Sequence, residues 1–211
     1  TNVSTDTVRL TTTHFVGGTP LTGSSTDYIT FTQFGNYVIA SNGIDAPQYY
    51  LMGTSSVFAN LSTIKTSGTV PTFKVSGVVR DFLVTGNDLT AANKIQWSGI
   101  NDISTWEAGT KQSDSQDLPG SGGQITHITS GEISYVFRLS MISPNRGAVL
   151  GRTVCQDNRR VFFYADDGFF EINGDTVKAI GAEKVNRFFD SDLNKAYSDR
   201  IVATTDPFNQ L

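Results

Sequence analysis

A compact β-hairpin is predicted for residues 158–175, and it constrains the possible folds more than any other segment. Val161–Tyr164 is an apolar run of β-forming residues, and Phe169–Ile172 is a second one. Between them, Ala165-Asp166-Asp167-Gly168 has the composition of a tight turn in which Gly168 can take a positive φ. Asn173-Gly174 begins another turn. Because weaker copies of this layout recur along the chain, we expect a repeated all-β architecture and not a single enzyme pocket.

The recurrence is visible in five short apolar strand cores. They are Tyr37–Ala40, Phe82–Val84, Tyr135–Phe137, Val161–Phe163 and Ile201–Ala203. Their starts at 37, 82, 135, 161 and 201 are separated by 45, 53, 26 and 40 residues. Blades of four-stranded propellers repeat at roughly 40–50 residues, so three of the four steps fit. We therefore predict a mainly all-β chain of β-propeller-like antiparallel blades, with residues 1–211 forming part of one such domain of a longer polypeptide.

The step of 26 residues is too short for a blade. We expect residues to be missing near 138–148, either through a deletion or because an unobserved loop was closed up in the numbering. A Cα–Cα separation well above about 3.8 Å in this interval would support the second explanation.

Composition excludes several classes of protein. The net charge of −4 does not indicate a basic nucleic-acid-binding surface, and no apolar run approaches membrane-spanning length. The single cysteine, Cys155, excludes an internal disulfide framework and is consistent with folding in a reducing compartment. Neither a phosphate-binding loop nor a Gly-x-Ser-x-Gly motif is present, so no cofactor and no catalytic residue are expected.

Two segments depart from the strand pattern. Apolar residues recur at helical spacing over 182–200, which predicts a helix or a helix pair packed on the β body, with a break at Asp190-Ser191-Asp192. Residues 109–124 are polar and glycine-rich, which predicts a surface loop.

Two groups of residues could form a binding site. Trp97 and Trp106 lie nine residues apart around a predicted turn. We favour a structural role in which Trp97 is a strand residue and Trp106 closes the loop over it, the alternative being an aromatic platform for a sugar or a partner protein. Asp166 and Asp167, near Glu171 and Asp175, could suggest a glycosidase or a calcium site. Adjacent aspartates before a glycine are more typical of a turn.

An ordered series of motifs resembles a known family. It runs through Ile95-Gln96-Trp97-Ser98 with the later Trp106, Gly131–Phe137, Asn145-Arg146-Gly147, Asn158-Arg159-Arg160-Val161-Phe162-Phe163, Ala165-Asp166-Asp167-Gly168-Phe169-Phe170, Ile180–Val185, Asp199-Arg200-Ile201 and Asp206-Pro207. The series resembles the tail hub or nozzle proteins of short-tailed bacteriophages, including the packaged-DNA stabilisation proteins and tail tubular protein B. The similarity is best over residues 80–211 and looser over 28–60. Relatives carry a longer stretch where this chain has only Arg138–Pro144, the interval at which the repeat spacing also fails.

The resemblance implies a structural virion protein built on a β-propeller, located in the phage tail after assembly in the host cytoplasm. It implies a homo-oligomeric ring, sixfold in arrangement, that contacts a portal–adaptor complex and other tail proteins. DNA would be retained before ejection and would pass through the lumen without sequence-specific binding. The family motif would include Trp97, Trp106, Asn158, Arg160, Asp166, Asp167 and Gly168 as structural residues.

Two other functions remain open at this level. A carbohydrate-binding or depolymerising propeller would use Trp97, Trp106 and Asp166-Asp167 in one solvent-open pocket. The second alternative is a propeller that acts as an adhesion module and has no viral role. The structural hypothesis instead places both tryptophans in the core and the aspartates in hairpin turns.

Overall fold

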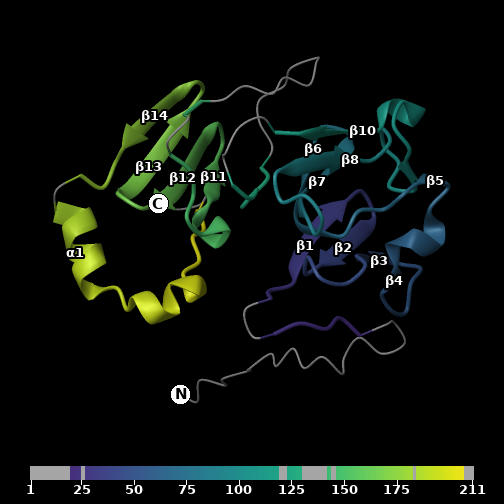
Figure 1. Cartoon of the computed structure of the whole chain (residues 1–211), viewed down its shortest axis with the longest axis horizontal. Coiled ribbons are helices and arrows are strands. Elements are labelled where there is room, and N and C mark those ends of the chain that lie inside the picture. Colours follow the sequence, from purple (N-terminus) through teal and green to yellow (C-terminus); the bar gives the residue numbers. More distant parts are fainter. Residues whose placement is uncertain are drawn as a thin grey trace.

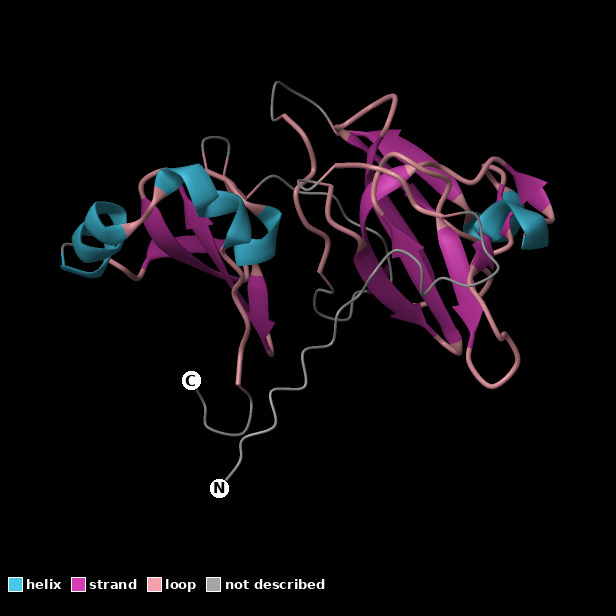
Figure 2. Ribbon diagram, turned by 90° about the horizontal axis from the view of Figure 1, so that it is seen from below, coloured by secondary structure: helices cyan, strands magenta, loops and turns pink. Residues whose placement is uncertain are grey.

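Three four-stranded antiparallel sheets contain most of the described strands (Figure 1). The computed structural model describes residues 20–24, 27–118, 123–129, 142–143, 146–182 and 184–206, and the statements below refer to these residues. The first sheet lies within residues 30–60, the second within 73–117 and the third within 155–179. Figures 1 and 2 show the first two sheets side by side and the third sheet apart from them. The fold is therefore mainly β, as the strand pattern predicts. The described sheets do not close into a ring.

The first sheet follows the chain order. Its strands are β1 (Thr30–Phe34), β2 (Tyr37–Ser41), β3 (Gln48–Leu51) and β4 (Ala59–Asn60). Phe34 pairs with Tyr37, so the first hairpin has a two-residue turn, Gly35-Asn36, in which Gly35 has a φ of 57°. A positive φ at this position matches the twist of the flanking strands. The predicted strand core at Tyr37–Ala40 is confirmed as part of β2.

In the second sheet, too, each strand pairs with the next strand of the same sheet along the chain. Its strands are β6 (Phe73–Val79), β7 (Phe82–Asp88), β8 (Lys94–Trp97) and β10 (Asp114–Asp117), in the spatial order β10-β8-β7-β6. A separate parallel pair joins β5 (Ser67–Gly68) to β9 (Thr105–Trp106). The predicted core at Phe82–Val84 lies in β7 and is buried.

The prediction of a surface loop over 109–124 is partly wrong. A short 3-10 helix, η3 (Thr110–Gln112), leads into β10, which pairs with β8 along its whole length. The strand is polar because it is an edge strand whose side chains are mostly exposed, and charged edge strands are a common protection against unwanted pairing. Composition alone therefore could not distinguish it from a loop.

The third sheet contains the predicted hairpin. Its strands are β11 (Cys155–Asp157), β12 (Arg160–Ala165), β13 (Gly168–Asn173) and β14 (Thr176–Ala179), and each pairs with the next. Ala165 pairs with Gly168, so Asp166 and Asp167 form a two-residue turn, and Gly168 has a φ of 127°. The hairpin over 158–175 is thus confirmed. Asn173 pairs with Thr176, so the second turn consists of Gly174 and Asp175 and begins at Asn173-Gly174 as predicted.

Two separate cores stabilise the sheets. The first joins the first two sheets and contains Phe34, Ile39, Leu61, Phe73, Leu83, Ile103 and Trp106. The second lies in the third sheet and contains Phe163, Ala165 and Phe170, with Val154 and Ile172 packed against them. Hydroxyl groups join β1 to β6, because the Thr30 hydroxyl donates to the Lys74 carbonyl at 3.0 Å and the Thr32 hydroxyl to the Ser76 carbonyl at 3.1 Å.

The C-terminal part is helical, as predicted, but the break falls later than expected. Helix α1 (Lys184–Asp192) is followed by the 3-10 helix η5 (Lys195–Arg200). The break lies at Leu193-Asn194, where the Asn194 side chain accepts a hydrogen bond from the Ala196 amide and caps η5. Asp190-Ser191-Asp192 is the last turn of α1 instead.

Three further sequence predictions have other outcomes. The strand core expected at Ile201–Ala203 is wrong, since this segment has no regular secondary structure and the Ala203 amide donates to the Arg152 carbonyl at 2.9 Å. The core at Tyr135–Phe137 and most of the interval 138–148 lie outside the described residues, and the proposed missing residues stay a prediction.

Candidate functional site

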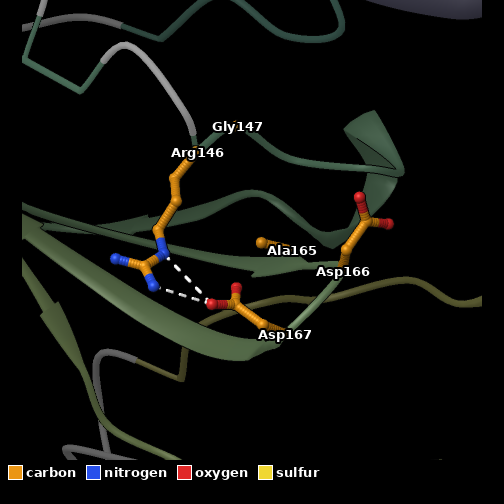
Figure 3. Close-up of a pocket in the computed structure, with 5 residues that line it drawn as sticks. All are labelled: Arg146, Gly147, Ala165, Asp166 and Asp167. Atoms are coloured by element: carbon orange, nitrogen blue, oxygen red, sulfur yellow. Dashed lines mark hydrogen bonds and ion pairs between the residues drawn. The ribbon is translucent and has the colours of Figure 1, made fainter.

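The turn between β12 and β13 borders a small open pocket of about 280 Å³ (Figure 3). It is lined by Arg146, Gly147, Ala165, Asp166 and Asp167. Nη2 and Nε of Arg146 lie 2.8 and 3.2 Å from Oδ2 of Asp167. In Figure 3 the Asp166 carboxylate points away from this pair. The two adjacent aspartates therefore do not share a ligand site.

The Arg146–Asp167 pair is exposed to solvent. About half of each side chain is accessible, with relative exposures of 47% and 53%. The hydrogen bond from Arg146 lowers the pKa of Asp167. The guanidinium carbon of Arg146 also lies 4.8 Å from the centre of the Phe170 ring. Exposed pairs of this kind contribute little to stability, so the pocket is a corner of the hairpin in which Arg146 covers an aromatic ring.

Asn186 of α1 connects the acidic turn to the helix. Its Oδ1 accepts from the Phe169 amide and its Nδ2 donates to the Asp167 carbonyl, both at 3.3 Å. A Cβ on Gly168 would lie 1.9 Å from Nδ2 of Asn186, and a Cβ on Gly181 would lie 2.0 Å from Oδ1. The positive φ of Gly168 disfavours any residue with a side chain, and such a side chain would also displace Asn186. Asn186 was not among the predicted site residues.

Aromatic rings complete the contact between α1 and the hairpin. The Phe189 ring lies 5.3 Å from the Tyr164 ring and 4.9 Å from the Phe169 ring, in edge-to-face geometry. The Tyr164 hydroxyl donates to Oδ1 of Asp190 at 2.6 Å, and this hydrogen bond raises the pKa of Tyr164 to about 12. Helix α1 is thus held on the hairpin by packing and by a polar contact.

Replacement of Tyr164 with phenylalanine tests this contact. We expect a loss of about 1 kcal/mol or less in the free energy of unfolding at neutral pH, because one partly exposed hydrogen bond is removed while the ring remains. The pKa of Tyr164 in the folded state, about 12, exceeds its ordinary value of 10.0. The contribution of Tyr164 is therefore complete below pH 10 and is lost between pH 10 and about 12.

Urea denaturation of the wild type and of the Tyr164→Phe variant across this alkaline range measures the effect. The difference in stability between the two proteins should be constant below pH 10 and shrink above it. A phenol that titrates at its ordinary value in the folded protein would contradict the assigned contact.

The two tryptophans lie in the second sheet and its loop, away from the acidic turn. Trp106 is 2% exposed, and its Nε1 donates to the Ile103 carbonyl at 2.7 Å. Trp97 is half-buried at the end of β8, and its Nε1 donates to the Gln112 carbonyl at 2.8 Å. Because both indole N–H groups bind nearby carbonyls, these side chains hold the loop between β8 and β10.

Asp102 organises this loop and was not predicted. Its carboxylate accepts from the Ser104 amide at 2.8 Å, the Thr105 hydroxyl at 2.9 Å and Nζ of Lys111 at 2.6 Å. Burial alone would raise the pKa of Asp102, but the hydrogen bonds from Lys111, Ser104 and Thr105 outweigh it and lower the pKa. Hydrogen-bond donors from its own loop already occupy the Asp102 carboxylate. We therefore assign Asp102 a structural role.

Asn158 lies in the two-residue turn between β11 and β12, and Arg160 is the first residue of β12. Asn158 has a φ of 52°, which asparagine tolerates better than most residues. Its Nδ2 donates to Oδ1 of Asp157 at 3.0 Å, and Nη2 of Arg160 lies 2.6 Å from Oδ2 of the same residue. The Arg160 guanidinium also lies 5.4 Å from the centre of the Phe162 ring. Both residues therefore stabilise the turn.

A larger cavity, of about 760 Å³, lies between the first two sheets and the third. Its lining is largely apolar and includes Phe31, Val75, Leu150 and Val202. At one side the Tyr28 hydroxyl donates to Asp199, and the Arg152 guanidinium lies 4.4 Å from the centre of the Tyr28 ring. The contacts of Tyr28 with Asp199 and Arg152 were not predicted, because they join segments that are more than a hundred residues apart.

Taken together, the predicted site residues do not converge. Trp97 and Trp106 belong to the second sheet and its loop, whereas Asn158, Arg160, Asp166, Asp167 and Gly168 belong to the third. No group of three or more potential metal-ligating side chains occurs in the described part of the chain. Among the described helices, none is both long enough and apolar enough to span a membrane. The pocket of tryptophans and carboxylates that a carbohydrate site requires is not formed by these residues.

Comparison with known proteins adds no assignment. No protein-family model matches the chain. No curated protein matches it significantly.

Proposed function

We propose that this chain is a structural protein of a short-tailed bacteriophage tail, and that it forms part of a ring-shaped hub or nozzle. The ring retains packaged DNA and conducts it during ejection. The observation that carries the proposal is the repetition of one unit: three four-stranded antiparallel sheets, in each of which a strand pairs with the next strand of the same sheet along the chain. Such meanders are the units of β-propellers, and we infer that each sheet is one blade of a propeller.

The contacts of the tryptophan and aspartate side chains support a structural role. The indole N–H groups of Trp97 and Trp106 bind nearby carbonyls. Asp102 forms an ion pair with Lys111 of its own loop, and Asp167 forms one with Arg146. Polar groups that satisfy one another within the chain are typical of a scaffold. A reacting group would be expected in a cleft with a strongly perturbed partner.

The charge of the chain is compatible with a conduit. Its net charge of −4 gives no basic surface that would hold a polyanion strongly. A mildly acidic wall lowers non-specific affinity for DNA, so DNA can move along it. Portal–adaptor and other tail proteins are the partners that this role requires.

Electron microscopy of the purified protein, together with sedimentation analysis, tests the proposal. We expect a closed ring of identical subunits, sixfold in arrangement, and antibodies against the chain should label the tail of the virion. A protein that stays monomeric at all concentrations and is absent from particles would overturn the proposal. Binding to host-surface glycans that is lost on replacement of Trp97 would favour the carbohydrate-binding alternative instead.

A further inference from the structure

We propose that Asn173 is a site of spontaneous deamidation that alters the turn between β13 and β14, whereas Asn42 is protected from it by the fold. The chain contains two Asn-Gly pairs, Asn42-Gly43 and Asn173-Gly174. Asparagine is a thermolabile residue. A following glycine favours the reaction because it has no side chain to hinder attack by its own backbone nitrogen. The two Asn-Gly pairs have the same covalent chemistry, but Asn173 is exposed to solvent and Asn42 is buried.

The Asn173-Gly174 pair is open to solvent. Both residues are exposed, and the Asn173 side chain makes no hydrogen bond with any described residue. Gly174 has a φ of 59°, and no atom lies within 4 Å of the position that a Cβ would occupy. No hydrogen bond from a described residue therefore holds the Asn173 side chain away from the Gly174 nitrogen.

The Asn42-Gly43 pair is enclosed. Asn42 is 1% exposed, and its Nδ2 donates to the Thr22 carbonyl and to Oδ2 of Asp45, both at 2.8 Å. Its Oδ1 accepts from the Asp45 amide at 2.9 Å. A Cβ on Gly43 would lie 2.8 Å from Cβ of Lys74. Ring closure at Asn42 would have to break these contacts, so the reaction there requires local opening.

The chemistry at Asn173 needs only water and a base from solvent. The Gly174 backbone nitrogen loses its proton and attacks Cγ of Asn173. The bond from Cγ to the side-chain nitrogen breaks, and that nitrogen takes up a proton and leaves as ammonia. Water then opens the resulting succinimide at either carbonyl, which gives aspartate or an isoaspartate whose backbone runs through the former side chain.

The two products should affect the turn differently. Asn173 pairs with Arg160 on one side and with Thr176 on the other. An aspartate keeps the backbone and adds one negative charge beside Asp175. An isoaspartate lengthens the backbone at the turn, which changes the register of β14 and weakens this edge strand.

Incubation of the folded protein at mildly alkaline pH, followed by trypsin digestion and tandem mass spectrometry, tests the proposal. Trypsin releases residues 161–178 as one peptide, because no lysine or arginine lies between Arg160 and Lys178. We expect this peptide to gain the mass that replacement of an amide NH₂ by OH produces. Asn42 should react at least about tenfold more slowly, since it reacts only from locally opened molecules.

Three controls make the result decisive. In urea, both sites should react at similar rates. The Asn173→Ser variant should show no change in this peptide, and Asn173→Asp should reproduce the charge change without faster hydrogen exchange in β14, which only the isoaspartate should cause. Equal rates at Asn42 and Asn173 in the folded protein, or an unchanged Asn173 under conditions that modify the unfolded chain, would overturn the proposal.

Discussion

Replacement of Trp106 with alanine is expected to lower the free energy of unfolding by about 3–5 kcal/mol. Trp106 is 2% exposed and lies in the core that joins the first two sheets, with Leu83 and Ile103. Its removal would leave a cavity that the surrounding strands fill only in part. The Ile103 carbonyl would also lose the indole N–H that it accepts from at 2.7 Å.

Trp97 provides the control, since its side chain also binds within the segment that joins β8 to β10 but is only half-buried. The Trp97→Phe variant keeps an aromatic ring and loses one hydrogen bond, which predicts a loss of about 0.5–1.5 kcal/mol. Urea denaturation followed by far-UV circular dichroism measures both changes without relying on tryptophan fluorescence. If Trp106→Ala were no more destabilising than Trp97→Phe, the assignment of Trp106 to the core would be wrong.

Replacement of Gly68 with alanine is the second change with a large expected effect, a loss of about 2–5 kcal/mol in the free energy of unfolding. Gly68 has a φ of 70°, and a Cβ there would lie 2.2 Å from the carbonyl carbon of Trp106 and 2.3 Å from the amide nitrogen of Glu107. The left-handed backbone costs about 1–2 kcal/mol for a residue with a side chain. The added methyl meets backbone atoms, which cannot rotate away, and overpacking costs about 1–3 kcal/mol more.

Gly53 separates these two contributions. It has a φ of 77°, close to that of Gly68, but no atom lies within 4 Å of its Cβ position. The Gly53→Ala variant should therefore lose only the conformational part, about 1–2 kcal/mol. The measurement is again chemical denaturation, combined with hydrogen exchange at the β5–β9 pair. Similar losses in both variants would show that the contact between Gly68 and Trp106 contributes nothing.

Features with short-range causes could be predicted from the sequence. The hairpin over 158–175 depends on the composition of its turn and on the β-forming residues beside it, and both act within a few residues. The helical segment over 182–200 was predicted from spacing for the same reason. Its break was misplaced because the cap is formed by Asn194, whereas the sequence offered several capping residues of similar strength.

Predictions that needed knowledge of neighbours were less successful. The helical spacing suggested one apolar face over 182–200, yet Phe188 is 72% exposed while Phe189 packs on Tyr164 and Phe169. Strand β10 was assigned to a loop because its side chains are polar, although its backbone completes the second sheet. In both cases the partner lies on another element, and single-sequence periodicity contains no information about it.

By itself the sequence determined the mainly β character of the chain and the position of the hairpin with its turn at Asp166 and Asp167. These features follow from the intrinsic strand and turn preferences of the residues, which do not depend on tertiary contacts. Only the tertiary structure decided how the side chains are used: Asn186 fits against Gly168, Asp102 binds its own loop, and Ile128 lies against Gly77 in the middle of β6. These contacts join residues that are distant in sequence or depend on the exact path of a loop, so they exist only once the sheets have packed.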